Sequence, residues 1–125
     1  MKKLQTIRTA GFTLVEIMIV VAIIGLLAGI ALPNFVKARA ASQANACINN
    51  LRKIDDAQNQ FAIEHQKNTG DTLNFPGDLT PYIKLNSNGS IPACPVGGDY
   101  YSDGTVGGKP TCSLGTTVTP PHVLP

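Results

Sequence analysis

The sequence opens with a long apolar run, "FTLVEIMIVVAIIGLLAGIAL", which extends from Phe12 to Leu32 and contains one charged side chain, Glu16. As a helix with a rise of 1.5 Å per residue, the run would span about 31 Å, close to the roughly 30 Å hydrocarbon layer of a membrane. We therefore expect a membrane-spanning helix over residues 12–35. Three basic residues before the run indicate a cytoplasmic N-terminal end: Lys2, Lys3 and Arg8.

Beyond this run, apolar positions recur every three or four residues, the period of one helix face. These positions are Ala41, Ala44, Ile48, Leu51, Ile54, Ala57 and Phe61. No proline or glycine interrupts residues 34–68, and Thr69, Gly70 and Asp71 supply a stop. We expect one helix from about residue 13 to 67, with residues 36–68 as its amphipathic continuation.

The composition changes at residue 69, because eight of the nine prolines lie beyond it, among dense glycine, serine and threonine. Glycine turns between short β-prone segments predict antiparallel strands near residues 99–102 and 109–114. A short helical turn is expected around Leu79. The tail "TTVTPPHVLP" is expected to be extended on the surface or frayed.

The lone carboxylate of Glu16 needs a partner, because an acid at the centre of a membrane helix costs on the order of 2.5–3.5 kcal/mol and less near an end. No basic side chain lies within one helical turn after Gly11. If the chain is cut between Gly11 and Phe12, the new α-amine lies four residues from Glu16, on the same helix face. That amine could belong to the same chain or to a neighbour.

Two ordinary interpretations of the run are a cleaved secretory signal and a simple membrane anchor. The run is too long for a secretory signal, and no A-x-A-like cleavage site follows it. A simple anchor gives no reason for Glu16. Within the run, Gly25 and Gly29 form a GxxxG spacing that lets helices approach closely, although membrane helices are rich in glycine generally. Pro33 predicts a kink or local unwinding.

Gly11 followed by "FTLVEIMIVVAIIGLLAGIALPNF" resembles the class III signal of type IV pilins and type II secretion pseudopilins, over residues 1 to about 40. The resemblance implies that a prepilin peptidase cuts after Gly11, that Phe12 becomes the N-methylated first residue, and that Glu16 acts in assembly. It also implies a filament made of copies of this chain. The further partners implied are an assembly ATPase, an inner-membrane platform protein, and minor pilins or pseudopilins.

The predicted fold class is α+β, a type IV pilin-like lollipop in which one long N-terminal helix is packed under a small C-terminal head with short antiparallel strands. The predicted divisions are a cleaved leader (1–11), a transmembrane or filament-core helix (12–35), its amphipathic continuation (36–68) and the head (69–125). The resemblance implies a bacterial inner-membrane protein with one pass and a periplasmic head, which later enters a periplasmic pseudopilus or a surface pilus.

Three cysteines, Cys47, Cys94 and Cys112, lie in the chain without CxxC or Cys/His zinc spacing. A bond between Cys94 and Cys112 would close a loop of seventeen residues and stabilise the fold by about 3 kcal/mol on the chain-entropy model. This candidate disulfide also resembles the C-terminal disulfide loop of many type IV pilins. Cys47 is interpreted as a buried core thiol or as the partner of either other cysteine.

No motif for catalysis or cofactor binding is present, so neither an enzyme nor a cofactor is predicted. His65 and His122 occur in unrelated contexts. Asp99 and Asp103 are weak calcium candidates, since two aspartates in a glycine-rich segment are usually turn formers. Beyond Ser42 the chain carries five basic and seven acidic residues, which gives no nucleic-acid footprint.

The preferred function is therefore a pseudopilin of a type II secretion system, whose pseudopilus drives protein export. The shortness of the head favours this interpretation. The first alternative is a type IV pilin of a surface fibre for adhesion, motility or DNA uptake, which the predicted Cys94–Cys112 loop favours. The second is a membrane-anchored binding module that never polymerises.

Overall fold

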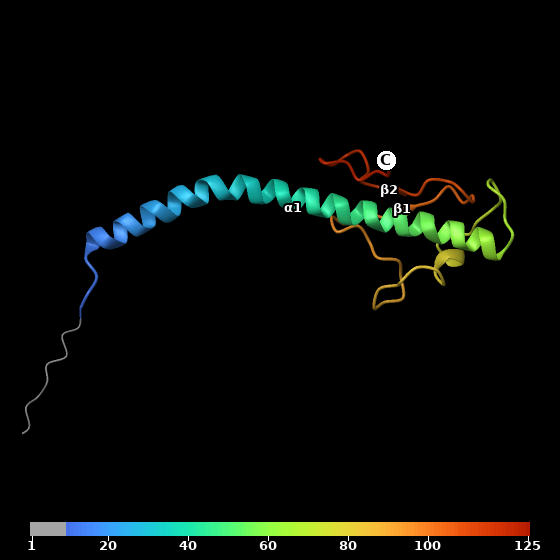
Figure 1. Cartoon of the computed structure of the whole chain (residues 1–125), viewed down its shortest axis with the longest axis horizontal. Helices are drawn as coiled ribbons and strands as arrows, with labels where there is room; N and C mark the ends of the chain where they lie inside the picture. The colour runs from blue at the N-terminus through green and yellow to red at the C-terminus, as the bar shows by residue number, and fades with distance from the viewer. Residues whose placement is uncertain (1–9) are drawn as a thin grey trace, which may run out of the picture. The chain divides into compact units, whose positions relative to one another are not determined.

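The structure is a computed structural model that describes residues 10–125. It contains the helix α1 (Leu14–Glu64), the single 3₁₀ turn η1 (Gly77–Leu79), and the strands β1 (Tyr100–Tyr101) and β2 (Thr111–Cys112) (Figure 1). The predicted fold class is confirmed, because one long N-terminal helix precedes a small region with a short antiparallel strand pair. The chain divides into two compact units, up to Val36 and from Lys37 onward.

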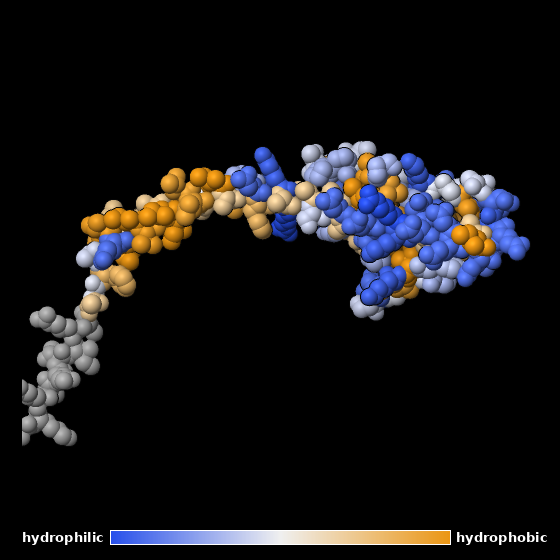
Figure 2. All heavy atoms as spheres, viewed as in Figure 1, coloured by the Kyte–Doolittle hydropathy of each residue, from blue (hydrophilic) through white to orange (hydrophobic). Residues whose placement is uncertain are grey.

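In the first unit, every large apolar side chain from Phe12 to Val36 is exposed within the chain itself. Figure 2 shows this as a continuous hydrophobic surface along the first half of α1. The helix runs through Pro33 without interruption, so the expected local unwinding is not present in this structure. Unwinding on assembly stays a prediction.

The helix ends at Glu64, a few residues before the predicted glycine stop. Gln66 takes the left-handed conformation (φ 52°). Its N–H bonds the Ile63 carbonyl at 3.4 Å, while the Lys67 N–H reaches back to the Ala62 carbonyl at 2.8 Å. These two bonds form a Schellman motif, which is usually built on glycine or asparagine. A glutamine in this position is not a recognisable stop in the sequence.

The second unit has a core of its own. The buried stripe of α1 consists of Ala44, Cys47, Leu51, Ile54, Ala57, Gln58 and Phe61. It packs against buried residues of the head, including Leu73, Leu79, Ile83, Tyr100 and Val106. The predicted stripe is largely confirmed, but Ala41 is exposed and Ile48 only half-buried. Cys47 and Gln58 belong to the stripe although the periodicity did not include them.

The strand pair is shorter than predicted. Tyr100 pairs with Cys112 and Tyr101 with Thr111, in antiparallel register. The ladder ends after these two pairs. A second, isolated bridge joins Thr72 to Thr105. The head is therefore held by turns and core packing more than by its sheet.

Candidate functional site

The N-terminus of α1 is built as a capping box by Thr13 and Glu16. The Thr13 backbone N–H donates to Glu16 Oε2 at 2.7 Å, and the Thr13 hydroxyl donates to the same oxygen at 2.9 Å. The Thr13 Oγ1 in turn lies 3.2 Å from the Glu16 backbone N–H. This reciprocal pairing satisfies two backbone donors that a helix start leaves free. The Thr-x-x-Glu pattern that signals it was readable in the sequence but was missed there.

Glu16 therefore has local partners in the intact chain. Both contacts to Thr13 use Oε2, and among the described residues Oε1 has no hydrogen-bond partner. The carboxylate is thus held in place by one oxygen and presents the other. An α-amine created at Phe12 would meet an acceptor whose position is already fixed.

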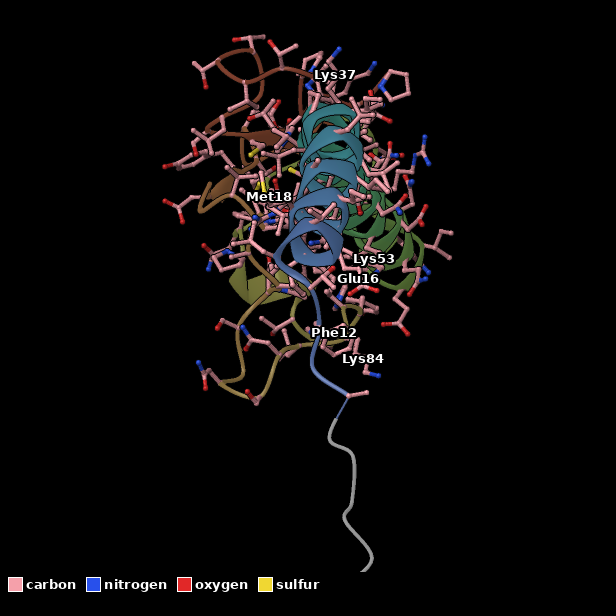
Figure 3. The ribbon with its side chains drawn as sticks, turned by 90° about the vertical axis from the view of Figure 1, so that its left-hand side faces the viewer. Phe12, Glu16, Met18, Lys37, Lys53 and Lys84 are labelled. Carbon is pink, nitrogen blue, oxygen red and sulfur yellow. The ribbon has the colours of Figure 1, made fainter. Side chains whose placement is uncertain are left out.

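Gly11 and Phe12 directly precede the helix and are exposed; Phe12 keeps 85% of its surface. Figure 3 labels Phe12 and Glu16, with Phe12 on the chain segment that leads into the first turn. The bond between Gly11 and Phe12 lies outside helix and strand. Most of the predicted leader (1–9) lies outside the described residues.

Gly25 and Gly29 lie in the exposed half of α1. A Cβ built on either glycine meets no atom within 4 Å in the described part of the chain. The two positions therefore leave a shallow notch on the helix that another helix could approach. Their role in packing stays a prediction, as does the role of Pro33.

The apolar half of α1 is long and hydrophobic enough to cross a membrane, with a mean hydropathy of 2.8 over its most apolar eighteen residues. None of that window is buried within the chain. Both facts fit a membrane anchor, although a signal sequence would pass the same length and composition test.

The candidate disulfide residues lie in a larger cluster in the second unit. Cys94 and Cys112 are free thiols, so the predicted disulfide between them is not formed within residues 10–125. Their sulfur atoms, Cys47 Sγ and a ring nitrogen of His122 all lie within 4.8 Å of one another. The Cys94 Sγ is 3.3 Å from His122 Nδ1. Sequence spacing gave no sign of this group, because each member comes from a different segment.

The pKa values of the Cys47 and Cys94 thiols are shifted in opposite directions. Burial raises the pKa of the Cys47 thiol to about 12, against a partial lowering by the Tyr100 hydroxyl. Burial also opposes ionisation of Cys94, but the N–H groups of Val96 and Gly98 and the neighbouring thiols bring its pKa below the ordinary value. The turn that carries Cys94 thus favours a thiolate.

Asp99 and Asp103, the weak calcium candidates, have ordinary structural partners. The Asp103 carboxylate accepts the Thr105 backbone N–H at 3.0 Å and the Thr105 hydroxyl at 2.8 Å, which closes a local turn. Asp99 engages Ser113 through backbone groups. In the described range, the group of metal-ligating side chains that lie together is the cysteine–histidine cluster.

Comparison with known proteins bears on the N-terminal segment. Residues 7–32 match the family described as the prokaryotic N-terminal methylation motif. Over 60 residues the chain is 50% identical to the type IV major pilin protein PilA of Myxococcus xanthus (strain DK1622). The chain belongs to the type IV pilin and type II secretion pseudopilin family.

Other relatives come from both branches of this pilin family. The chain is 28% identical over 104 residues to the type II secretion system core protein G of Escherichia coli (strain K12), covering 76% of this chain and 72% of that one. It is 41% identical over 54 residues to a fimbrial protein of Pseudomonas aeruginosa, covering 43% of this chain. The match spans 27% of the Myxococcus pilin and 35% of the fimbrial protein. No solved structure matches the chain.

Membership in the pilin family also bears on chemistry. Pilin-family members are structural subunits and not enzymes, which confirms the prediction that the chain is not an enzyme.

Proposed function

We propose that this chain is the pilin of a type IV surface fibre, made as a membrane-anchored precursor and processed between Gly11 and Phe12. The observation that carries the proposal is the conjunction of the methylation motif with an exposed apolar helix that starts on the Thr13–Glu16 capping box. The 50% identity to a major type IV pilin supports the pilus over the pseudopilus.

The exposed helix explains why the filament would form. The sixteen large apolar residues from Phe12 to Val36 are exposed, with no covering partner among residues 10–125. In the membrane, lipid covers them; outside it, only other copies of the same helix would remove them from water. Gly25 and Gly29 would allow close contact between these helices.

Glu16 would set the order in which copies add. Cutting after Gly11 places a cationic α-amine on Phe12, one residue before Thr13. The free Oε1 of Glu16 would accept that amine from the same or a neighbouring chain, while Oε2 holds the capping box. An uncompensated carboxylate in an apolar core is costly, so pairing would favour the subunit that brings the amine.

The further partners proposed are a prepilin peptidase that cuts and methylates, an inner-membrane platform protein and assembly ATPase that extract the helix, and minor pilins. The orientation proposed is a cytoplasmic N-terminus and a periplasmic head, since Lys2, Lys3 and Arg8 precede the apolar run. The proposed divisions of the chain remain 1–11, 12–35, 36–68 and 69–125.

A second candidate function is a secretion pseudopilin. The match to the type II secretion core protein covers 76% of this chain and so includes part of the head, whereas the pilin match covers 48%. Both candidates predict the same processing and the same role for Glu16. They differ in whether the filament is found on the cell surface or in the periplasm.

The experiment that tests the filament function combines intact mass with a matched pair of variants. A native chain that starts at Phe12 and carries one extra methyl group is expected. Glu16→Gln keeps an acceptor for the capping box but loses the charge, whereas Thr13→Ala breaks the box and keeps the charge. We expect Glu16→Gln to be processed normally but to reduce filament yield by roughly tenfold or more, because it removes one partner of a desolvated charge pair.

Thr13→Ala is expected to assemble at close to the wild-type yield. Sheared surface filaments would indicate the pilus, and filaments confined to the periplasm the pseudopilus. A chain that retains Met1, together with full function of Glu16→Gln, would instead point to an anchored module that does not polymerise.

A further inference from the structure

Four side chains of metal-binding type meet in the interior of the second unit. Cys47 comes from α1, Cys94 from the turn that precedes β1, Cys112 from β2 and His122 from the C-terminal segment. Their exposed fractions are 0%, 4%, 7% and 2%. Polar atoms of these residues are thus turned away from solvent and toward one another.

The size of the cluster suits a tetrahedral ion. With Zn–S bonds of about 2.3 Å and Zn–N bonds of about 2.0 Å, the ligand atoms of such a site lie roughly 3.5–3.8 Å apart. In the cluster all four ligand atoms lie within 4.8 Å, and the Cys94 Sγ to His122 Nδ1 distance is 3.3 Å. A disulfide needs two sulfurs about 2.05 Å apart and would use two of the four groups.

The turn around Cys94 is closed by backbone hydrogen bonds. The Cys94 N–H donates to the Gly98 carbonyl at 3.2 Å. The Gly97 N–H donates to the Cys94 carbonyl at 2.9 Å, and Gly97 has φ +90°. The backbone of this turn therefore fixes the place from which the Cys94 side chain enters the cluster.

The remaining ligands are also held by neighbours. Tyr100, which pairs with Cys112 in the strand register, accepts a bond on its hydroxyl from Asn50 Nδ2 at 3.2 Å. The His122 backbone N–H donates to the Gly115 carbonyl at 2.7 Å, which fixes the C-terminal segment over the cluster. Hydrogen bonds of the fold therefore hold the segments that carry these side chains in place.

The chemistry of the donors selects the ion. Thiolate sulfur and imidazole nitrogen suit zinc, whereas calcium and magnesium require oxygen ligands. Four protein ligands leave no open position, which is typical of a structural site and not of a catalytic one. Three thiolates and a neutral imidazole around Zn²⁺ carry a net charge of −1.

We propose that Cys47, Cys94, Cys112 and His122 bind one zinc ion, through three thiolates and His122 Nδ1, as a structural centre of the head. On binding, each of the three thiols releases its proton to solvent, and no oxidation or reduction takes place. The ion would tie α1, the Cys94 turn, β2 and the C-terminal segment together. This inference is independent of how the N-terminal segment is processed.

The test uses the full chain, purified in detergent without chelator. We expect one zinc per chain by elemental mass spectrometry. Thiol alkylation under native conditions should be blocked until a zinc chelator is added. Replacement of zinc by Co²⁺ should give thiolate-to-cobalt charge-transfer absorption and the strong visible bands of a tetrahedral ion.

Variants separate metal binding from folding. His122→Cys supplies a fourth thiolate and should retain the ion with an altered cobalt spectrum, whereas His122→Ala should weaken binding by more than the roughly 10–100-fold that outer-shell changes cost. His65→Ala is the matched control, because His65 is exposed and lies outside the cluster. It should bind zinc as the wild type does.

Three results would overturn the proposal. One is a chain without zinc whose two cysteines react only after reduction, which would establish the Cys94–Cys112 disulfide. Another is a chain without zinc whose three thiols react once unfolded, which would make them ordinary core thiols. The third is unchanged zinc affinity in His122→Ala. A Glu16→Gln chain that binds zinc but fails to assemble would separate this site from the filament function.

Discussion

From Phe12 to Val36, the large apolar side chains keep half or more of their surface exposed; Leu27, for example, keeps 62%. In residues 37–125, by contrast, Leu51, Ile54 and Leu79 are buried completely. Both sets of residues include leucines and isoleucines of one helix, α1, so helix-forming tendency does not separate them. The difference is whether the head segments supply a covering surface.

The contrast indicates what covers the apolar side chains of each unit. The second unit has an internal core, so its substitutions should alter the stability of the isolated chain. The first unit has only an outer surface, so its substitutions should act through the membrane or through other copies of the chain. Figure 2 shows the two kinds of surface, mainly hydrophobic over the first unit and mainly hydrophilic over the second.

The largest effect on the free energy of unfolding is expected when a large side chain in the core of the second unit is shortened. Leu51→Ala should lower the free energy of unfolding by about 2–5 kcal/mol, through lost burial and a residual cavity. Unfolding of the full chain in detergent can be followed by tyrosine fluorescence. All three tyrosines, Tyr82, Tyr100 and Tyr101, lie in the head, and the chain has no tryptophan.

Leu27→Ala is the matched control in the exposed half of α1. It should change the same free energy by less than about 0.5 kcal/mol, as surface substitutions do. An equal loss in both variants would mean that the first unit already packs against something in the isolated chain, and the contrast between the units would be wrong.

A smaller effect is expected at Gly98, where side chains of the head lie close to the backbone. A Cβ on Gly98 would lie 2.9 Å from Cys112 Sγ and 3.1 Å from Leu114 Cγ, so Gly98→Ala must displace packed side chains. Overpacking of this kind costs about 1–3 kcal/mol. The same unfolding measurement checks it.

Gly77→Ala provides the comparison for Gly98→Ala. Its added Cβ would meet only the Asn74 side chain, at an ordinary 3.6 Å. We expect a change within about 0.5 kcal/mol. If both alanine variants unfold alike, the Cys94 turn is not tightly packed against β2.

The features predicted well from the sequence are those set by local pattern. The apolar run and the helical period fixed α1 to within a few residues, and the glycine-rich composition indicated a head with short strands. The stop at Gln66 was missed because a left-handed glutamine carries no local signal. The Thr13–Glu16 capping box has a local signal, the Thr-x-x-Glu spacing, although it was not predicted.

The cysteine–histidine cluster could not be predicted in the same way. Zinc motifs are recognised by short spacings, but here 46 residues separate Cys47 from Cys94, and packing brings the two together. His122 follows two prolines in a tail that was expected to be extended on the surface or frayed, yet it is 2% exposed. Only the tertiary arrangement reveals that the tail reaches the core.

The smallest effect on the free energy of unfolding is expected at a buried polar side chain in the core of the second unit. Gln58 is fully buried on α1; its Nε2 donates to Ser102 Oγ at 3.1 Å, but Oε1 has no partner among the described residues. A buried unpaired acceptor costs about 1–3 kcal/mol, whereas one neutral hydrogen bond contributes about 0.5–1.5 kcal/mol. Gln58→Met has a similar shape and removes both.

Gln58→Met should therefore leave the free energy of unfolding unchanged or raise it by up to about 1 kcal/mol. Gln58→Glu is the opposing control, because it buries a carboxylate beside the same serine and should destabilise the head. If Gln58→Met is less stable than wild type by more than about 1 kcal/mol, the amide stabilises the isolated head. The buried stripe of α1 would then require a polar side chain at residue 58. The core of the second unit would not be stabilised by apolar packing alone, and the contrast with the exposed apolar surface of the first unit would be less complete.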